Sequence, residues 1–228
     1  MTAKAVLSYN MIDNGDKVLV AVSGGKDSVV MLDALYGFKR FGKVDFEMEA
    51  IHIAVDDVPY SVDKDFFTDY CQGKGIPFHY ITISAGMEKR GKKAPCFVCS
   101  WHRRKRLFTF AKENGFKKLA LGHHMDDAVE TLLINMTYHA NITSLPGKLK
   151  MFEGAMYLIR PLILLRDFET LKYAKIKGFE NLSEECPYSG TTNRNTARNI
   201  IEQLEKLHPG AVANIFNSLK NISNEYLP

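Results

Sequence analysis

A short glycine-containing segment near the start of the chain separates two apolar stretches. The run Lys17–Val22 precedes the hexapeptide Ser23–Ser28, and Val29–Leu32 follows it. This order predicts a buried strand, a tight loop and a helix, because two adjacent glycines let the backbone turn sharply. Several backbone N–H groups and the positive end of the helix dipole would then face one point in the loop. The segment therefore predicts a phosphate site at the end of a buried strand.

The hexapeptide Ser-Gly-Gly-Lys-Asp-Ser also indicates which kind of phosphate loop this is. Common NTPases need a glycine, four residues and then Gly-Lys-Ser/Thr, and this spacing is not present here. The segment resembles instead the pyrophosphate loop of the ATP pyrophosphatase superfamily, whose members transfer AMP to a substrate oxygen and release pyrophosphate. A strand-to-helix turn without a ligand is the competing interpretation. The resemblance implies that ATP binds at this loop.

Apolar segments alternate with helical patterns as far as residue 138. Strands are expected at Lys17–Val22, Phe46–Val55, His79–Ile83 and Lys118–Leu121, and helices from the loop to about Phe41, from Val62 to Lys74, over Cys99–Asn114 and over Asp127–Tyr138. This alternation predicts an α/β fold, with a parallel sheet and helices on both faces. Ligands bind at the carboxyl ends of such strands, so polar residues that follow the strands are the candidate site.

The pattern changes after residue 138, where a short hairpin across Met151–Ile159 is expected. A helix from Asp167 to about Lys177 should end at Gly178, and two further helices are expected over Thr196–Leu207 and Ala211–Ile222. We therefore expect a nucleotide-binding α/β domain over residues 1–160, carrying a Cys-x-x-Cys insertion. A small extension over residues 161–228 would pack back onto it.

Composition limits the class of protein and its partners. The 228 residues are 46% hydrophobic, which is enough for a sizeable core, and the formal charge of +4 permits a polyanionic partner without requiring one. The sequence has no leader pattern and no apolar run long enough to cross a bilayer, which predicts a cytoplasmic protein without a membrane partner. Four cysteines are too few for a disulfide scaffold, so they are expected to be free, catalytic or metal-binding.

Two cysteines, Cys96 and Cys99, lie where a loop is expected to enter a helix. A helix N-terminus favours the thiolate form, and the pair fits a redox dithiol, half of a zinc site or two unrelated cysteines. Cys186 lies in a distant loop and would supply a third ligand. Three thiolates suit either zinc with a histidine or an iron–sulfur cluster. We expect Cys71 to be a small buried side chain, as most free cysteines are.

Together these residues resemble the tRNA 2-thiolation enzymes, above all the tRNA 2-thiocytidine synthetase family, with the T-loop thiouridine synthetases second. The features that carry the resemblance are Ser23–Ser28, the Cys96-x-x-Cys99 pair before a basic helix, Leu121–Asp127 followed by Glu130-Thr131, and Cys186. The resemblance extends from about residue 16 to the last helix. It implies that Cys96, Cys99 and Cys186 hold a 4Fe-4S cluster with one iron left open.

The resemblance also implies the reaction. ATP would adenylate the 2-oxo group of a pyrimidine, in this case a cytidine of the anticodon loop, because the oxygen is otherwise a poor leaving group. Sulfur would come from hydrosulfide or a sulfur donor protein, and holding it on the open iron would fix its position for attack. The implied cofactors are therefore ATP, Mg²⁺ and the cluster, and the implied partner is tRNA.

Roles for individual residues follow from the same resemblance. The pyrophosphate cradle would consist of Ser23, Gly24, Gly25, Lys26 and Ser28. Asp27 would help to hold magnesium and Asp127 would be the second catalytic carboxylate, although helix capping is a competing role for Asp127. His123 and His124 follow one expected strand and would line the nucleotide pocket, and Asp56 follows another and would contact ribose or metal. A hydrogen-bonded structural histidine and a helix-entry turn are the respective alternatives.

Two basic runs, residues 89–93 and residues 103–106, flank the first two cysteines. Single charge runs are usually solvated faces, but two beside a candidate cluster favour binding to an RNA backbone. Arg103, Arg104 and Arg106 are the candidate RNA-binding residues. Trp101 is either a stacking platform for an unpaired base or part of the core. A homodimer would enlarge the RNA-binding surface.

The sequence departs from the family pattern at Ser189, where many 2-thiocytidine synthetases carry the second cysteine of a late Cys-x-x-Cys pair. Three candidate cysteines remain, which is enough for the cluster. The T-loop enzymes usually carry terminal zinc-binding modules, and this chain has none. Other interpretations are a tRNA-lysidine synthetase or amide-forming enzyme, an iron–sulfur sensor or zinc-stabilised nucleotide-binding module, and an enzyme acting on a small molecule.

Overall fold

Strands and helices alternate along most of the chain in the computed structural model, which describes residues 1–89, 91–92, 94–180, 182–183, 186, 188 and 193–226. The strands are β1 (Asp16–Ala21), β2 (Phe46–Val55), β3 (Phe78–Ile83), β4 (Lys118–Ala120), β5 (Lys148–Met151) and β6 (Met156–Ile159). The α-helices are α1 (Thr2–Ser8), α2 (Lys26–Arg40), α3 (Lys64–Gln72), α4 (Pro95–Glu113), α5 (Met125–His139), α6 (Asp167–Lys177), α7 (Asn193–Leu207) and α8 (Ala211–Ser218). Short 3-10 turns occur at η1 (Met87–Lys89), η2 (Phe152–Gly154) and η3 (Asn224–Tyr226).

These six strands form one sheet in the order β3-β2-β1-β4-β6-β5. Neighbouring strands are parallel except at the edge, where β5 runs antiparallel to β6. The predicted α/β class is therefore confirmed. The expected hairpin begins earlier than predicted, at Lys148, and its antiparallel strand extends the sheet.

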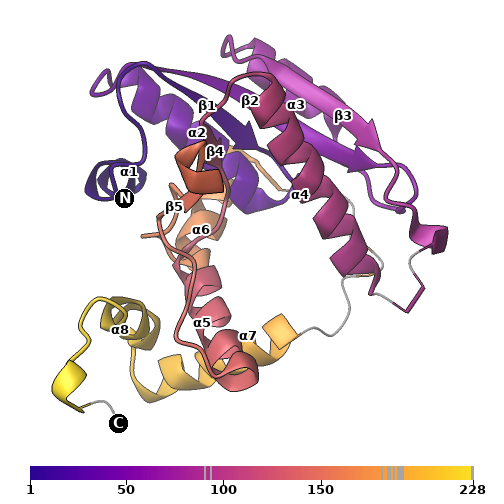
Figure 1. Ribbon diagram of the computed structural model, residues 1–228. Coiled ribbons are helices and arrows are strands. Elements are labelled where there is room, and N and C mark those ends of the chain that lie inside the picture. Colours follow the sequence, from indigo (N-terminus) through magenta and orange to yellow (C-terminus); the bar gives the residue numbers. More distant parts are fainter. Residues whose placement is uncertain are drawn as a thin grey trace.

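Successive side chains of the central strands enter two different hydrophobic cores. Val18 and Val20 of β1 pack with the side chains of α2 and α5, whereas Leu19 packs on the opposite face, where α4 contributes Phe110. This split follows from the two-residue period of a strand covered on both faces. Figure 1 shows α4 crossing one face of the sheet. Side chains of this helix and residues at the ends of the strands line the cavity of the candidate site.

Helix α4 begins at Pro95, four residues before the predicted start. Proline is favoured in the first turn of a helix, and Ala94 precedes it in an extended conformation. As a result Cys96 and Cys99 both lie within the first turns of the helix. Helix α1 was not predicted, because its seven residues are too few to show a clear helical period, but it buries Ala5 and Val6.

The C-terminal helices pack on the first part of the chain. Helix α6 contacts α2, while α7 and α8 contact α5, as Figure 1 shows for α7. Gly178 ends α6 in the left-handed conformation, with a φ of 68°, as expected for a glycine stop. Among the described residues, no helix combines the length and the apolar composition needed to span a bilayer.

Candidate functional site

The phosphate loop joins β1 to α2 and is braced by its own serines. The backbone N–H of Ser23 donates to Ser28 Oγ at 3.1 Å, and that hydroxyl donates to the carbonyl of Gly25 at 2.7 Å. Gly24 has a φ of +94°, and a Cβ atom there would collide with Val62. Only glycine therefore fits at this position.

A cavity of about 650 Å³ lies beside this loop. Ser23, Gly25, Asp27 and Ser28 line it from the loop, and His123 and Asp127 line it from the segment after β4. Much of its remaining wall is apolar, with side chains from the strands and from α4. The polar residues thus gather at the carboxyl ends of parallel strands, as the sequence predicted.

Asp127 lies in the first turn of α5 and is buried. Its Oδ2 accepts the backbone N–H of His124 at 3.0 Å, and its Oδ1 lies 3.8 Å from a guanidinium nitrogen of Arg194 on α7. Capping and a position in the cavity wall are therefore combined in one side chain. The neighbouring Asp126 accepts from Nε of Arg166 at 3.0 Å.

A network of charged and polar groups adjoins the cavity, and α6 supplies two of its members, Asp167 and Thr170. Nζ of Lys26 lies 2.9 Å from Asp27 Oδ1 and 2.7 Å from Asp167 Oδ1. Thr170, which is also on α6, donates to Asp27 Oδ1 at 2.6 Å. Sequence reasoning missed Asp167 and Thr170, because nothing in the sequence links them to a loop about 140 residues earlier.

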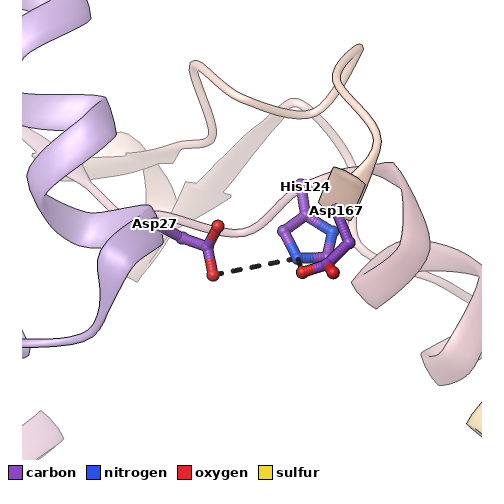
Figure 2. A group of neighbouring side chains, drawn as sticks. All are labelled: Asp27, His124 and Asp167. Atoms are coloured by element: carbon purple, nitrogen blue, oxygen red, sulfur yellow. Dashed lines mark ion pairs between the residues drawn. The ribbon is translucent and has the colours of Figure 1, made fainter. Parts of the chain in front are cut away.

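His124 completes this network (Figure 2). Its Nε2 lies 3.3 Å from Asp167 Oδ1 and 3.9 Å from Asp27 Oδ2. Burial favours the neutral ring, but contacts with Asp126 and Asp167 outweigh it and raise the pKa of His124 to about 10. The imidazolium and the Lys26 ammonium together offset the negative charge of the surrounding aspartates.

His123 has the opposite environment. Burial is the main reason that its pKa falls to about 4, so the ring is neutral at pH 7. Its Nδ1 is buried and has no hydrogen-bond partner among the described residues. Because the ring also lines the cavity, it offers a free polar atom to a ligand.

Two of the three candidate ligand cysteines, Cys99 and Cys186, line a second cavity of about 110 Å³. This cavity shares the side chains of Ile53 and Arg103 with the larger one, so the two are adjacent. Cys96 is exposed, and its thiol donates to the carbonyl of Tyr188 at 2.9 Å.

The sulfurs of the three cysteines are close enough to influence one another. Burial raises the pKa of the Cys99 thiol, Arg103 opposes this, and the charges of Cys186 and Cys96 raise it further. Cys71 is completely buried in the main core, and burial raises its pKa to about 11. The prediction that Cys71 is a core residue is thus confirmed.

The arginines of α4 divide into two groups. Arg103 and Arg104 line the large cavity, whereas Arg106 pairs with Glu113 at 3.1 Å and does not line it. Trp101 is 50% exposed, and Nζ of Lys105 lies 5.2 Å from its ring centroid. Of the two alternatives for Trp101, the exposed platform agrees with the structure and the core position does not.

Some predicted site residues lie elsewhere or are not described. Asp56 is exposed and does not line either cavity, while the adjacent Asp57 accepts backbone N–H groups from Ala85 and Met87. The nucleotide contact predicted for Asp56 therefore has no support in this geometry. Arg90 and Lys93 of the first basic run, and Ser189 after the third cysteine, lie outside the described residues.

Comparison with known proteins shows which family the sequence resembles over most of its length. The family described as the PP-loop domain matches residues 2–205. The tRNA-cytidine(32) 2-sulfurtransferase of Alcanivorax borkumensis is 34% identical over 231 residues, which cover 99% of this chain and 81% of the relative. The protein of the same name from Vibrio campbellii is 36% identical over 228 residues, covering 98% of this chain and 76% of the relative.

Two solved structures have a similar fold. The U34-tRNA thiolase NcsA from Methanococcus maripaludis, solved with its [4Fe-4S] cluster, has a TM-score of 0.78 at 23% identity and covers 100% of this chain and 78% of that one. Phosphoadenylyl-sulfate reductase from Candida auris has a TM-score of 0.51 at 12% identity, covering 78% and 79%. The likeness to both is one of fold. The family match over most of the sequence and the relatives at 34% and 36% identity confirm the resemblance, and the chain belongs to the PP-loop family, among the tRNA-cytidine(32) 2-sulfurtransferases.

Proposed function

We propose that the chain is an ATP-dependent enzyme that replaces the 2-oxo group of cytidine 32 in tRNA with sulfur. The names of its relatives support this substrate. The observation that carries the proposal is that the phosphate-loop cavity and the cysteine-lined cavity share a wall formed by Ile53 and Arg103. An activated pyrimidine and a sulfur source would therefore be held next to each other.

Activation would take place in the large cavity. Ser23, Gly25 and Ser28 would bind the outer phosphates of ATP, while the α-phosphorus is transferred to the 2-oxo oxygen and pyrophosphate leaves. Neutral His123, with an unpartnered Nδ1, is suited to a hydrogen bond with the nucleotide. The adenylated oxygen then leaves as AMP when sulfur attacks the ring carbon.

Magnesium fits the same cavity. Asp27 and Asp127 both line it, and carboxylate oxygens are the ligands that Mg²⁺ prefers. When bound with ATP, the ion would neutralise phosphate charge. Lys26 now contacts Asp27, and we expect its ammonium to contact a phosphate oxygen once the ion takes its place.

A three-cysteine iron–sulfur cluster fits Cys96, Cys99 and Cys186. Thiolates are the usual ligands of such clusters, and the described lining of the smaller cavity includes Cys99 and Cys186 but no histidine. When bound, the cluster would supply an iron without a protein ligand, able to accept sulfur from hydrosulfide or a donor protein. Arg103, beside Cys99, favours the thiolate form.

The tRNA would approach along α4. Arg104 is exposed and lines the cavity, and Trp101 presents a half-exposed ring one turn earlier on the same helix. An anticodon-loop base leaving its stack would meet this aromatic surface before it enters the cavity. The proposed partners are cytoplasmic tRNA, a sulfur donor and a second copy of the chain.

The proposal is tested by mass spectrometry of tRNA nucleosides from a strain that lacks the gene. We expect 2-thiocytidine to be lost, and to return with the wild-type gene and with Cys71→Ala, but not with Asp127→Asn or Cys186→Ala. After anaerobic purification, the wild-type protein should contain iron and sulfide. The content should be lower in Cys186→Ala and unchanged in Cys71→Ala. Loss of 2-thiouridine instead would favour the T-loop alternative, and an unchanged nucleoside profile would contradict tRNA thiolation.

A further inference from the structure

Arg160 carries a buried charge that the described residues do not balance. It follows β6 and is only 4% exposed. One terminal nitrogen donates to the carbonyl of Pro146 at 2.6 Å, but Nε has no partner. The ion pairs of arginines in the described part of the chain are made by Arg106, Arg166, Arg194 and Arg198. A buried guanidinium without a carboxylate partner is costly, which indicates that its partner is a ligand.

The guanidinium keeps its charge despite this environment. Burial lowers the pKa of Arg160 to about 10, and the nearby Asp127 opposes the fall. The group is therefore still protonated at neutral pH. An anion is the ligand that would compensate it.

Strand geometry places Arg160 near the phosphate loop. Ile159 pairs with Ala120 and Ala120 pairs with Val20, so Arg160 is level with Ala21 on a strand two positions away. Two strand spacings amount to about 10 Å. Leu158 and Arg160 alternate with Ile159, and both line the large cavity.

Burial distinguishes Arg160 from the other arginines of this cavity. Arg104 and Arg194 are exposed and Arg103 is half-buried, so these three arginines are open to solvent and to an RNA backbone. Arg160 is buried and lines the cavity together with apolar strand residues such as Leu119 and Leu158. A small anion attached to a flat apolar group matches this position better than a polynucleotide does.

We propose that Arg160 binds the α-phosphate of the nucleotide, an inference that rests on the proposed adenylation. The outer phosphates occupy the loop at Ser23–Ser28, and the adenosine lies against the apolar wall. The α-phosphate is the group between them. Arg160 would thereby hold the phosphorus in place and stabilise the negative charge that grows on its oxygens during AMP transfer.

The test compares the binding of four ligands to the purified protein by calorimetry under anaerobic conditions. Arg160→Met keeps the length of the side chain and removes its charge, and Arg40→Met is the control, because Arg40 lies at the far end of α2 from the loop. We expect Arg160→Met to weaken ATP and AMP binding by about 10- to 100-fold, and to leave pyrophosphate and adenosine within about twofold. Arg40→Met should bind all four as the wild type does.

Thermal unfolding separates binding from a structural role. Without nucleotide, Arg160→Met should melt at or above the wild-type temperature, because an unbalanced buried charge has been removed, and its shift with AMP should be lost. A lower melting temperature with an intact AMP shift would mean that Arg160 only supports Pro146, and would overturn the inference. The inference would also be overturned if Arg160→Met lost pyrophosphate binding but still bound AMP.

A conservative variant covers the case in which Arg160→Met fails to fold. Arg160→Lys keeps the charge but loses the planar fork, so AMP binding should weaken by less and pyrophosphate binding should not change. If Arg160→Lys bound AMP as tightly as the wild type does, the inference would be refuted and the proposed function would be left intact. A wild-type protein that binds no nucleotide would instead refute the proposed function, and the inference with it.

Discussion

Replacing Arg198 with methionine should destabilise the protein in a strongly pH-dependent way. Nε of Arg198, on α7, lies 2.6 Å from Glu130 Oε1 on α5. Glu130 is only 2% exposed, and its other carboxylate oxygen has no partner among the described residues. Arg198→Met keeps most of the aliphatic stem but leaves a buried carboxylate without its cation.

The expected magnitude follows from the burial of each partner. Removing one member of a fully buried ion pair costs about 3–5 kcal/mol, and an exposed pair is worth about 0–1 kcal/mol. The Arg198 side chain is 56% exposed while Glu130 is buried, so we expect a loss of about 2 kcal/mol in the free energy of unfolding at pH 7.5. Glu130→Gln should cost less, about 1 kcal/mol or below, because no buried charge remains.

The pH dependence has a definite sign. Burial raises the pKa of Glu130 and Arg198 opposes this, so removal of Arg198 should raise the pKa further. A group whose pKa is higher in the folded state loses stability as pH rises through that pKa, by up to about 1.4 kcal/mol per pH unit. The free energy of unfolding of Arg198→Met should therefore come closer to that of the wild type as pH falls from 7.5 to 5.

Urea unfolding at both pH values measures these differences, with the double variant Glu130→Gln/Arg198→Met as the control. The double variant should be more stable than Arg198→Met at pH 7.5 and should show no added pH dependence. A deficit of Arg198→Met that stays constant between pH 7.5 and pH 5 would refute the reasoning. It would mean that Glu130 is solvated without Arg198, or that only the packing of α7 was lost.

Two other measurements test further parts of the structure. Burial raises the pKa of Asp33, but hydrogen bonds from Tyr70 and Tyr173 outweigh it and lower the pKa below its usual value. Asp33→Asn should thus lower the free energy of unfolding by about 2 kcal/mol near neutral pH. In acid, this difference from wild type should disappear as pH falls from about 4 through the pKa of Asp33 in the folded state. A difference that persists there would exclude the carboxylate as its source. In filter binding, Arg104→Ala should weaken tRNA binding and reduce the slope of log affinity against log salt concentration by about one. Arg106→Ala should have smaller effects on the affinity and the slope, because Arg106 is already paired with a glutamate. Equal effects would contradict the division of α4 into two groups of arginines.

Local features of the site were predictable from the sequence because they depend on neighbouring residues. The loop Ser23–Ser28 needs only its glycines, its serines and the strand and helix around it. Cys96 and Cys99 are three residues apart, so their proximity was predictable, although the helix that holds both begins at Pro95, before the predicted start. The α/β class followed in the same way, from the alternation of apolar periods.

Features that depend on tertiary packing were not predictable. Asp167 was recognised only as a helix start, yet its carboxylate contacts Lys26 because α6 packs against α2. Arg160 gave no signal at all, since a single arginine after a strand is usually solvent-exposed. Its significance comes from burial, which the sequence does not encode locally.

The expected extension beyond residue 160 shares a buried core with the first part of the chain. Ala174, Ile201 and Val212 from beyond this boundary belong to the same buried core cluster as Leu32. A chain ending at residue 160 would expose that apolar surface and leave the Glu130 carboxylate without Arg198. We therefore expect one cooperative unfolding transition for the whole chain, seen alike by circular dichroism and by the fluorescence of its single tryptophan. Two separate transitions would instead support two units, and would mean that α6 and α7 can leave the site while the phosphate loop stays folded.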